Sequence, residues 1–456
     1  MSLDSLKSLT FPGGIHPPEK KSITEDCEIQ SGFAVDQVAV MLSQHIGAVC
    51  RPLVAKGDQV KAGQKIGDSD SFVSAPVHSP VDGKVKEIAL RPHAVIGRVP
   101  AVIIDTVPDN QIKQAGFQIR EDFNAEKYSV EKICEASREA GLVGMGGAGF
   151  PTRVKIEPNP NMPKTTMIVN GCECEPYITC DYRIMLEWTK QIIAGVKLAR
   201  KASGCEKVFI AIEDNKPEAI EVMGKVLNDM GSYGIEIVTV KTKYPQGGER
   251  QLIRSVLKKN VPTGGIPPMI GILVLNVATC AALAEAVIAD EPLTHRVVTV
   301  TGEGIAKPGN YYVPIGTPLE KLIEYCGSVT KKSVRVILGG PMMGIAIADL
   351  NTPTTKTTGA ITIITKEQIG LAKFEKRQTA CIRCGRCLMV CPENLNPTKI
   401  AHAVKNNLLD VAQDYYMSAC IECGCCSYIC PANIELTGYI KTGKIYVARQ
   451  KKKIPG

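Results

Sequence analysis

Eight cysteines in two runs of identical spacing constrain the C-terminal part of this 456-residue chain more than any other feature does. The runs are Cys381-x2-Cys384-x2-Cys387-x3-Cys391-Pro392 and Cys420-x2-Cys423-x2-Cys426-x3-Cys430-Pro431. Gaps of two residues let one loop wrap three thiolates around one corner of a metal cluster, and the wider gap before proline carries the fourth thiolate away from it. This part of the chain is therefore expected to fold around metal.

The spacing resembles the run found twice in bacterial ferredoxins and implies two [4Fe–4S] clusters with crossed ligands. One cluster is expected on Cys381, Cys384, Cys387 and Cys430, and the other on Cys420, Cys423, Cys426 and Cys391. Zinc also uses CxxC pairs, but a closed zinc site gives no reason for a repeated fourth cysteine before proline. Residues 397–417, between the runs, are expected to be helical, which is typical of α-helical ferredoxin domains.

The remaining ten of the 18 cysteines show no repeated ligand pattern and are expected to be buried or loop thiols. These include Cys172, Cys174 and Cys180, and Cys425 is expected to be a spare thiol inside the second run. Residues 1–21 contain no apolar core of the signal-peptide type. In a cytosolic chain, so many cysteines predict metal binding rather than disulfides.

A glycine-rich stretch over residues 141–152 carries five glycines in nine residues, which suits a backbone that approaches a ligand closely. Successive free N–H groups in such a loop favour an anion such as phosphate. The letters also fit the dinucleotide pattern G-x-G-x-x-G, but that pattern requires a preceding strand. Residues 129–140 instead predict a helix that ends at Gly141, so a flexible turn is the alternative interpretation.

A second motif follows at residues 167–176, where a short apolar strand runs into Asn-Gly-Cys-Glu-Cys-Glu-Pro. Together, GGAGFPT and VNxxExEP resemble the FMN- and NADH-binding subunit of respiratory complex I and its relatives. The segment FPGGIHPP at residues 11–18 narrows the resemblance to the RnfC subunits of the Rnf complexes, which are membrane-bound ferredoxin:NAD oxidoreductases.

That resemblance implies a set of site residues. Gly146, Gly147 and Gly149 would line the flavin and nicotinamide, and Lys155 would act near the isoalloxazine as the catalytic cation that stabilises anionic reduced flavin. Asn170, Glu173 and Glu175 match family positions, while Cys172 replaces an aspartate. In the segment that resembles YxxGEE, Tyr244, Gly247 and Glu249 match and Gly248 replaces the first acid. Asn276 and Thr279 match part of NNVET.

The chain is expected to be a multidomain α/β protein. Residues 1–125 hold a module that resembles biotinyl and lipoyl barrel-sandwich domains, but its tip at residues 68–72 has no lysine, which favours a docking or structural role over a carrier role. Residues 126–290 alternate strands at 207–213 and 235–240 with a helix at 217–230, as in an α/β domain that would bind FMN and NADH. Residues 291–365 resemble a soluble-ligand-binding β-grasp domain with a threonine-rich linker at 351–358, and residues 366–456 form the α-helical two-cluster ferredoxin domain.

Charge and apolar patterning exclude two classes of protein. The net charge of +8 comes without a long basic block, and aromatic residues make up 5%, so we expect no nucleic-acid partner. Residues 269–289 are apolar but contain Asn276, Thr279 and Glu285, which predicts a buried strand and a helix rather than a membrane span. We therefore expect a soluble chain.

The resemblance implies a peripheral subunit on the cytoplasmic face of the cell membrane. It would exchange hydride between NAD(H) and FMN and pass single electrons through two [4Fe–4S] clusters. Its partners would be NAD(H), the other subunits of a complex that couples electron transfer to Na⁺ or H⁺ transport, and ferredoxin through that complex. The alternatives are a cobalamin reductase of the diol-utilisation type, and a non-catalytic electron-wire subunit whose nucleotide site is degenerate at Gly248.

Overall fold

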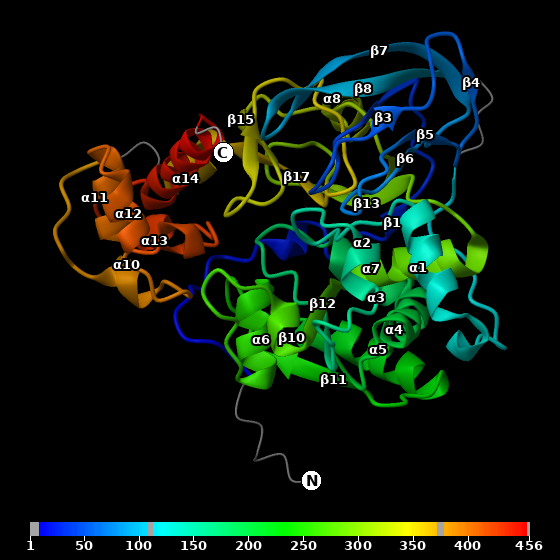
Figure 1. Ribbon diagram of the computed structural model, residues 1–456. Helices are drawn as coiled ribbons and strands as arrows, with labels where there is room; N and C mark the ends of the chain where they lie inside the picture. The colour runs from blue at the N-terminus through cyan, green and yellow to red at the C-terminus, as the bar shows by residue number, and fades with distance from the viewer. Residues whose placement is uncertain (1–8, 108–112, 372–377, 454–456) are drawn as a thin grey trace.

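The computed structural model describes residues 9–107, 113–371 and 378–453. Four parts follow one another along the chain (Figure 1): a barrel-sandwich module, an α/β domain, a β-grasp domain and a helical cluster domain that carries the cysteine runs. The segment before the barrel-sandwich module runs between the α/β domain and the cluster domain.

The barrel-sandwich module consists of two antiparallel sheets with strand orders β2-β8-β7-β4 and β3-β5-β6. Alternate residues of β2 and β8, among them Val38, Val40 and Val102, pack against Ile66 and Val77 of the second sheet. The expected module is confirmed. Its strands are β2 (Gln37–Met41), β3 (Arg51–Pro52), β4 (Gln59–Val60), β5 (Lys65–Asp68), β6 (Val77–His78), β7 (Gly83–His93) and β8 (Gly97–Thr106).

A parallel sheet in the order β11-β10-β9-β12 forms the centre of the α/β domain. Both faces are covered, because Met167 and Val169 of β9 pack into one apolar cluster and Ile168 packs into another with Leu252 and Ile253. The strands are β9 (Thr166–Gly171), β10 (Lys207–Glu213), β11 (Ile235–Val240) and β12 (Ile272–Asn276). The helices are α1 (Val130–Glu139), α2 (Thr152–Ile156), α3 (Cys180–Glu187), α4 (Thr189–Ser203), α5 (Pro217–Asp229), α6 (Glu249–Leu257) and α7 (Val277–Ala284), with short turns η3 (Ala125–Lys127), η4 (Pro267–Ile270) and η5 (Glu285–Ala289).

The predicted elements of this domain are found. Residues 207–213 and 235–240 are strands β10 and β11, and the predicted helix at 217–230 is α5. The apolar run at 269–289 divides into β12 and α7, as expected. No helix in the described ranges combines the length and apolar character needed to cross a bilayer.

The β-grasp domain is built on a six-stranded sheet in the order β1-β14-β13-β17-β15-β16. Its elements are β1 (Ile29–Gln30), β13 (His295–Thr301), β14 (Gly309–Pro314), β15 (Ser333–Leu338), β16 (Ile345–Ile347), β17 (Ala360–Thr365), α8 (Leu319–Tyr325) and α9 (Lys366–Leu371). Strand β1 comes from the N-terminal segment, after η2 (Lys21–Ile23), and pairs in parallel with β14. The bounds 1–125, 126–290, 291–365 and 366–456 stay predictions, and residues 1–8 and 454–456 at their ends lie outside the described ranges.

The threonine-rich segment at residues 351–358 is not a linker, so that expectation is wrong. Thr354 and Lys356 are each only 1% exposed. The Thr354 hydroxyl donates to the carbonyl of Pro314, and the Lys356 ammonium donates to the carbonyls of Pro76 and Gly141 at 2.6 Å each. Runs of polar side chains usually indicate solvent exposure, but here they bond inside the protein and join the barrel-sandwich module to the α/β domain.

The cluster domain consists of short helices around the two cysteine runs. They are α10 (Arg386–Met389), α11 (Pro397–Lys405), α12 (Leu409–Asp414), η6 (Met417–Ala419), α13 (Cys425–Ile429) and α14 (Leu436–Lys453). Residues 397–417 are helical as predicted, although two helices share the stretch. Backbone conformation repeats between the runs, since Gly385 and Gly424 both have positive φ, as do Asn394 and Asn433.

Candidate functional site

The glycine loop lies at the carboxyl ends of β9 and β12. It follows α1, which is capped at Ser129 and ends as predicted at Gly141 with a positive φ. The amide of Met145 donates to the Thr279 hydroxyl at 3.0 Å, which fixes the loop to α7. A Cβ at Gly146 would lie 2.8 Å from the Asn276 side chain, whereas a Cβ at Gly147 would meet no atom within 4 Å. Gly147 therefore faces open space beside a fixed backbone.

Gly149 serves a different contact. It has a φ of +73°, its carbonyl accepts from the amide of Ile46, and an added Cβ would lie 3.1 Å from the carbonyl of Gln44. The far end of the loop is thus packed on the barrel-sandwich module rather than facing the open space at Gly147.

Two asparagines end neighbouring strands of the sheet. Asn170 of β9 and Asn276 of β12 are paired in register. The Asn276 side chain accepts from the amides of Ala278 and Thr279 at the start of α7 and donates to Asp181 at 2.6 Å. Asn170 donates to the carbonyl of Gly247 at 2.8 Å. The carboxyl edge of a parallel sheet is where α/β proteins bind ligands, and the structure brings four predicted residues together there.

Lys155 is half-buried and lies on α2. Its ammonium donates to Glu249 and to the carbonyl of Val274, both at 3.1 Å. Val274 belongs to β12, two residues before Asn276, so Lys155 and Glu249 lie at the same edge of the sheet as the glycine loop. Lys155 is therefore held in place by the sheet and by an ion pair.

Glu173 caps a helix. Its carboxylate accepts from the amide of Asp181 at 2.6 Å and from that of Tyr182 at 3.2 Å, at the start of α3. Burial raises the pKa of the Glu173 carboxyl to about 7, while the nearby Lys21 ammonium acts in the opposite direction. Glu175 points elsewhere and accepts from the amides of Met342 and Met343 in the β-grasp domain. The two acids thus serve separate contacts.

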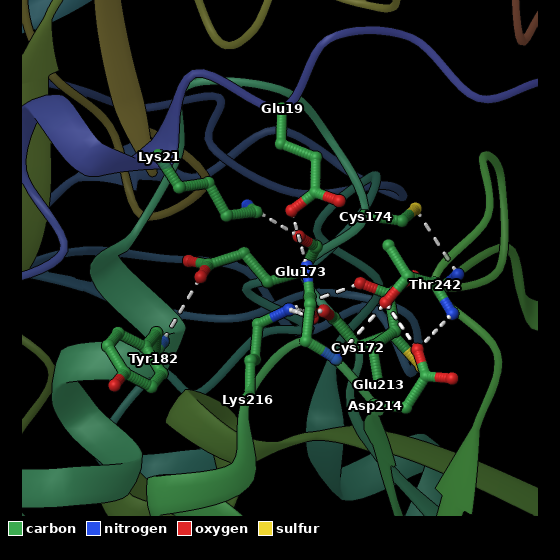
Figure 2. A network of polar contacts seen from close by, with 12 residues as sticks. Glu19, Lys21, Cys172, Glu173, Cys174, Tyr182, Glu213, Asp214, Lys216 and Thr242 are labelled. Carbon is green, nitrogen blue, oxygen red and sulfur yellow. Dashed lines mark hydrogen bonds and ion pairs between the residues drawn. The ribbon is translucent and has the colours of Figure 1, made fainter.

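Two buried lysines hold the loop that carries these acids (Figure 2). The Lys21 ammonium donates to the carbonyls of Glu173, Glu175 and Ile178 at 2.8, 3.1 and 2.6 Å. The Lys216 ammonium donates to the carbonyl of Cys172 at 2.6 Å and forms an ion pair with Glu213 at 3.1 Å. Burial lowers the pKa of Lys21. Sequence reasoning missed both lysines, because neither belongs to a motif and each acts on residues distant in sequence.

The three cysteines near this loop lie as expected, with Cys172 and Cys180 buried and Cys174 half-buried. Cys174 accepts from the amide of Gly247 at 3.3 Å.

Tyr244 faces the cluster domain instead of the glycine loop. It is 2% exposed, and its hydroxyl donates to the carbonyl of Cys423 at 2.8 Å. Tyr244 packs with Cys425, which is fully buried and not a loose surface thiol. Nearby, Gln251 and Arg250 of α6 contact Glu393 of the cluster domain. The α/β domain and the cluster domain therefore meet beside the second cysteine run.

One pocket in the cluster domain gathers Cys391 with Cys420, Cys423 and Cys426. Two of these sulfurs already accept backbone N–H groups, Cys391 from Leu395 and Cys420 from Glu422, each at 3.3 Å. Four thiols around one pocket lined by the apolar residues Pro392 and Ile440 are a donor set that suits a [4Fe–4S] cluster.

The other predicted set is divided between surface and interior. Cys381 and Cys384 are exposed, whereas Cys387 and Cys430 are buried. Cys430 accepts from the amide of Ile434 at 3.5 Å, which repeats the contact between Cys391 and Leu395. Cys387 packs beside Cys426 in one small apolar cluster, so the two runs adjoin. The ligands of this set stay a prediction.

Comparison with known families agrees with this architecture. Residues 9–110 match the RnfC barrel sandwich hybrid domain, 137–285 the Nuo51 FMN-binding domain, 297–346 the SLBB domain and 373–431 the 4Fe–4S dicluster domain. These four domains define a flavin- and iron–sulfur-dependent electron-transfer protein. The open space at Gly147, the capped start of α7 and the four-thiol pocket fit FMN and a cluster as its cofactors.

Two relatives place the chain more narrowly. The RnfC-type subunit of the proton-translocating ferredoxin:NAD⁺ oxidoreductase complex of Clostridium ljungdahlii is 40% identical over 407 residues, covering 89% of this chain and 87% of the relative. Its counterpart in the Na⁺-translocating complex of Acetobacterium woodii is also 40% identical, covering 89% of this chain and 90% of the relative. The chain belongs to the RnfC family, whose members are subunits of ion-translocating ferredoxin:NAD⁺ oxidoreductase complexes. A solved NAD⁺-reducing [NiFe]-hydrogenase in its air-oxidized state aligns with a TM-score of 0.48 and 19% identity, covering 74% of this chain and 60% of that one.

Proposed function

We propose that this chain is the peripheral subunit of a membrane ferredoxin:NAD oxidoreductase complex that exchanges hydride between NAD(H) and FMN and passes the electrons singly to two [4Fe–4S] clusters. FMN supplies the conversion between a two-electron donor and one-electron carriers. The observation that carries the proposal is the pocket of Cys391, Cys420, Cys423 and Cys426 directly beside Tyr244 of the α/β domain. A cluster in that pocket would be the first acceptor next to the flavin.

The residues that would hold FMN and NAD(H) are those gathered at the sheet edge. The glycines at 146 and 147, Asn276 and Thr279 would bind the flavin, with Lys155 as the nearby cation and Asn170, Glu173, Gly247 and Glu249 around it. Glu175 and Tyr244 would support this site through their contacts with the β-grasp and cluster domains. Gly149 would anchor the loop.

We also propose that the subunit lies on the cytoplasmic face of the membrane. NAD(H) is a cytosolic substrate, and the net charge of +8 suits the anionic surface of that leaflet. The ions would be transported by other subunits.

The electron-wire alternative rests on Gly248, where the family has an acid. A Cβ at Gly248 would lie 2.4 Å from Gln251, whose side chain donates to Glu393 of the cluster domain. The missing acid therefore accompanies a contact with the cluster domain, which explains the substitution without loss of the nucleotide site. The cobalamin-reductase alternative is weakened by the match of the barrel-sandwich module to the RnfC family.

An NADH:ferricyanide assay on the isolated, FMN-loaded subunit tests the proposal. Turnover is expected, and it would exclude the electron-wire alternative. Absence of turnover in protein that retains FMN would contradict hydride exchange at this site, and reduction of cob(III)alamin at a comparable rate would favour the cobalamin reductase.

Gly147→Val is expected to lose most bound FMN without unfolding the protein. The added side chain would occupy open space in this fold, since no atom lies within 4 Å of the Cβ position, but it would fill the approach to the loop. FMN content per purified chain measures the effect. Gly224→Val is the control, because its Cβ would meet only Ile237 at 3.9 Å on α5. Normal FMN content in Gly147→Val would contradict the loop assignment.

Lys155→Ala is expected to slow flavin reduction by NADH about 100-fold, at the lower end of the effect of removing one preorganised group at a developing charge. Both iron–sulfur signals should stay intact. Stopped-flow absorbance of the flavin measures the rate. Lys201→Ala is a matched control, since Lys201 also bonds one carboxylate and one carbonyl, both of Glu126. Equal rates in the two variants would make Lys155 a structural lysine.

A further inference from the structure

The segment at residues 9–15, here called the N-terminal strap, lies between the α/β domain and the cluster domain. We propose that Gly13 and Gly14 of the strap are positioning residues, which set the separation between the flavin site and the four-thiol pocket. The inference rests on the proposed function, because it concerns the step in which electrons leave the flavin for that pocket.

On one side the strap is fixed to the edge of the α/β sheet. Leu9 bridges to Val240 at the end of β11, and its carbonyl accepts from the amide of Lys241 at 3.0 Å. Phe11 is 2% exposed and lies under the Lys243 ammonium, which is 4.7 Å from the ring centroid and donates to the Phe11 carbonyl at 2.9 Å. The start of the strap thus moves with the α/β domain.

On the other side the strap contacts the backbone of a predicted cluster ligand. The amide of Gly14 donates to the carbonyl of Val390 at 2.9 Å, one residue before Cys391. A Cβ at Gly13 would lie 2.9 Å from the carbonyl oxygen of Cys391 and 3.2 Å from that of Val390. The strap backbone therefore lies against the turn that brings Cys391 into the pocket.

The strap also fixes Tyr244, which is the direct contact between the two domains. Ile15 and Tyr244 exchange two backbone hydrogen bonds of 2.9 Å each, and the Tyr244 hydroxyl donates to the carbonyl of Cys423. Ile15, Tyr244 and Cys423 share one buried apolar cluster. Two predicted ligands of the pocket, Cys391 and Cys423, are therefore each located through the strap or its partner.

Only glycine fits at both positions. Gly13 and Gly14 have φ values of +79° and +77°, which side chains rarely adopt. A Cβ at Gly14 would lie 2.7 Å from the Tyr244 carbonyl and 2.9 Å from the Phe11 ring. An alanine at either position must push the cluster domain or Tyr244 away from the strap, because the atoms it meets include fixed backbone.

The test uses the full chain loaded with FMN and both clusters. Gly13→Ala and Gly14→Ala are mixed rapidly with NADH, and flavin absorbance is followed together with cluster reduction by freeze-quench electron paramagnetic resonance. Flavin reduction should keep its wild-type rate. Cluster reduction should slow roughly tenfold, within the range that a displacement of up to about 1 Å costs a positioned reaction.

Gly32→Ala is the matched control. Gly32 also has a positive φ, +102°, but its Cβ would meet no atom within 4 Å, so the backbone strain is present without the displacement. Wild-type cluster reduction is expected there. Wild-type cluster reduction in both Gly13→Ala and Gly14→Ala, with normal cluster content, would overturn the proposal.

Two further measurements cover the remaining outcomes. If the alanine variants lose their clusters, Ile15→Ala, which removes only side-chain packing against Tyr244, must slow cluster reduction, and a wild-type rate would overturn the proposal. If NADH does not reduce FMN even in the wild type, the proposed function fails and hydrogen exchange decides the strap. Peptides containing Gly14 and Tyr244 should exchange faster in Gly13→Ala than in Gly32→Ala, and equal exchange would refute it.

Discussion

Replacing Cys391 by alanine is expected to abolish the same iron–sulfur signal that is lost when Cys420 is replaced, although Cys391 belongs to the first run in sequence. The physical reason is the pocket that already gathers Cys391 with Cys420, Cys423 and Cys426. Loss of one thiolate would convert that centre to a three-iron form or remove it. Electron paramagnetic resonance of the reduced and oxidised protein distinguishes the two clusters.

The reciprocal pair completes this test. Cys430→Ala should affect the same cluster as Cys381→Ala, and NADH should still reduce FMN in all four variants because the flavin precedes both clusters. Cys326→Ala, which removes a fully buried thiol far from both runs, should retain both signals. If Cys391→Ala matched Cys381→Ala instead, the ligands would not cross, although two clusters would remain.

Lys21→Met is expected to destabilise the protein by roughly 3 kcal/mol or more and to lower its FMN content. Three buried carbonyls would lose their donor, and each unsatisfied buried polar group costs about 1–3 kcal/mol. Lys21→Arg should recover only part of this, since a planar guanidinium cannot aim three donors from one atom. Urea unfolding of the FMN-free and FMN-loaded protein measures both effects.

The neighbouring Lys20→Met is the control for Lys21→Met. Lys20 is half exposed and forms a 3.5 Å ion pair with Glu303, and such pairs contribute at most about 1 kcal/mol. In Lys21→Ala, ammonium or methylamine should restore stability by occupying the space between the three carbonyls. Equal stability of the Lys20 and Lys21 variants would show that the three carbonyls do not depend on the buried ammonium.

Local patterns predict the elements whose residues interact with near neighbours. Strands β10 and β11 carry apolar residues that are buried on both sheet faces, so their limits follow from the sequence itself. Helix α1 has a serine cap and a terminal glycine, and both ends agree with the prediction. The cysteine spacing likewise predicts the composition of the four-thiol pocket, because the crossed geometry depends on gap length alone.

The residues that sequence patterns miss act through long-range contacts. Lys21 serves carbonyls more than 150 positions away, and Lys356 joins Pro76 to Gly141. A single sequence gives no sign of such partners, since an isolated lysine is normally expected at the surface. The threonine-rich segment at 351–358 differs from its prediction for the same reason. Its composition is that of a solvated loop, and only the surrounding carbonyls make it part of the interior.

The pairing of Gly14 with Val390 also has a consequence for synthesis of the chain on the ribosome. Domains generally fold as units while translation proceeds at about 5–20 residues per second, so Val390 emerges roughly 20 to 75 s after Gly14. Throughout that interval Phe11 and Ile15, both apolar, lack the C-terminal partner that finally covers them. The nascent N-terminus is thus a natural binding site for chaperones, and release of the finished chain coincides with closure of its first residues on its last domain.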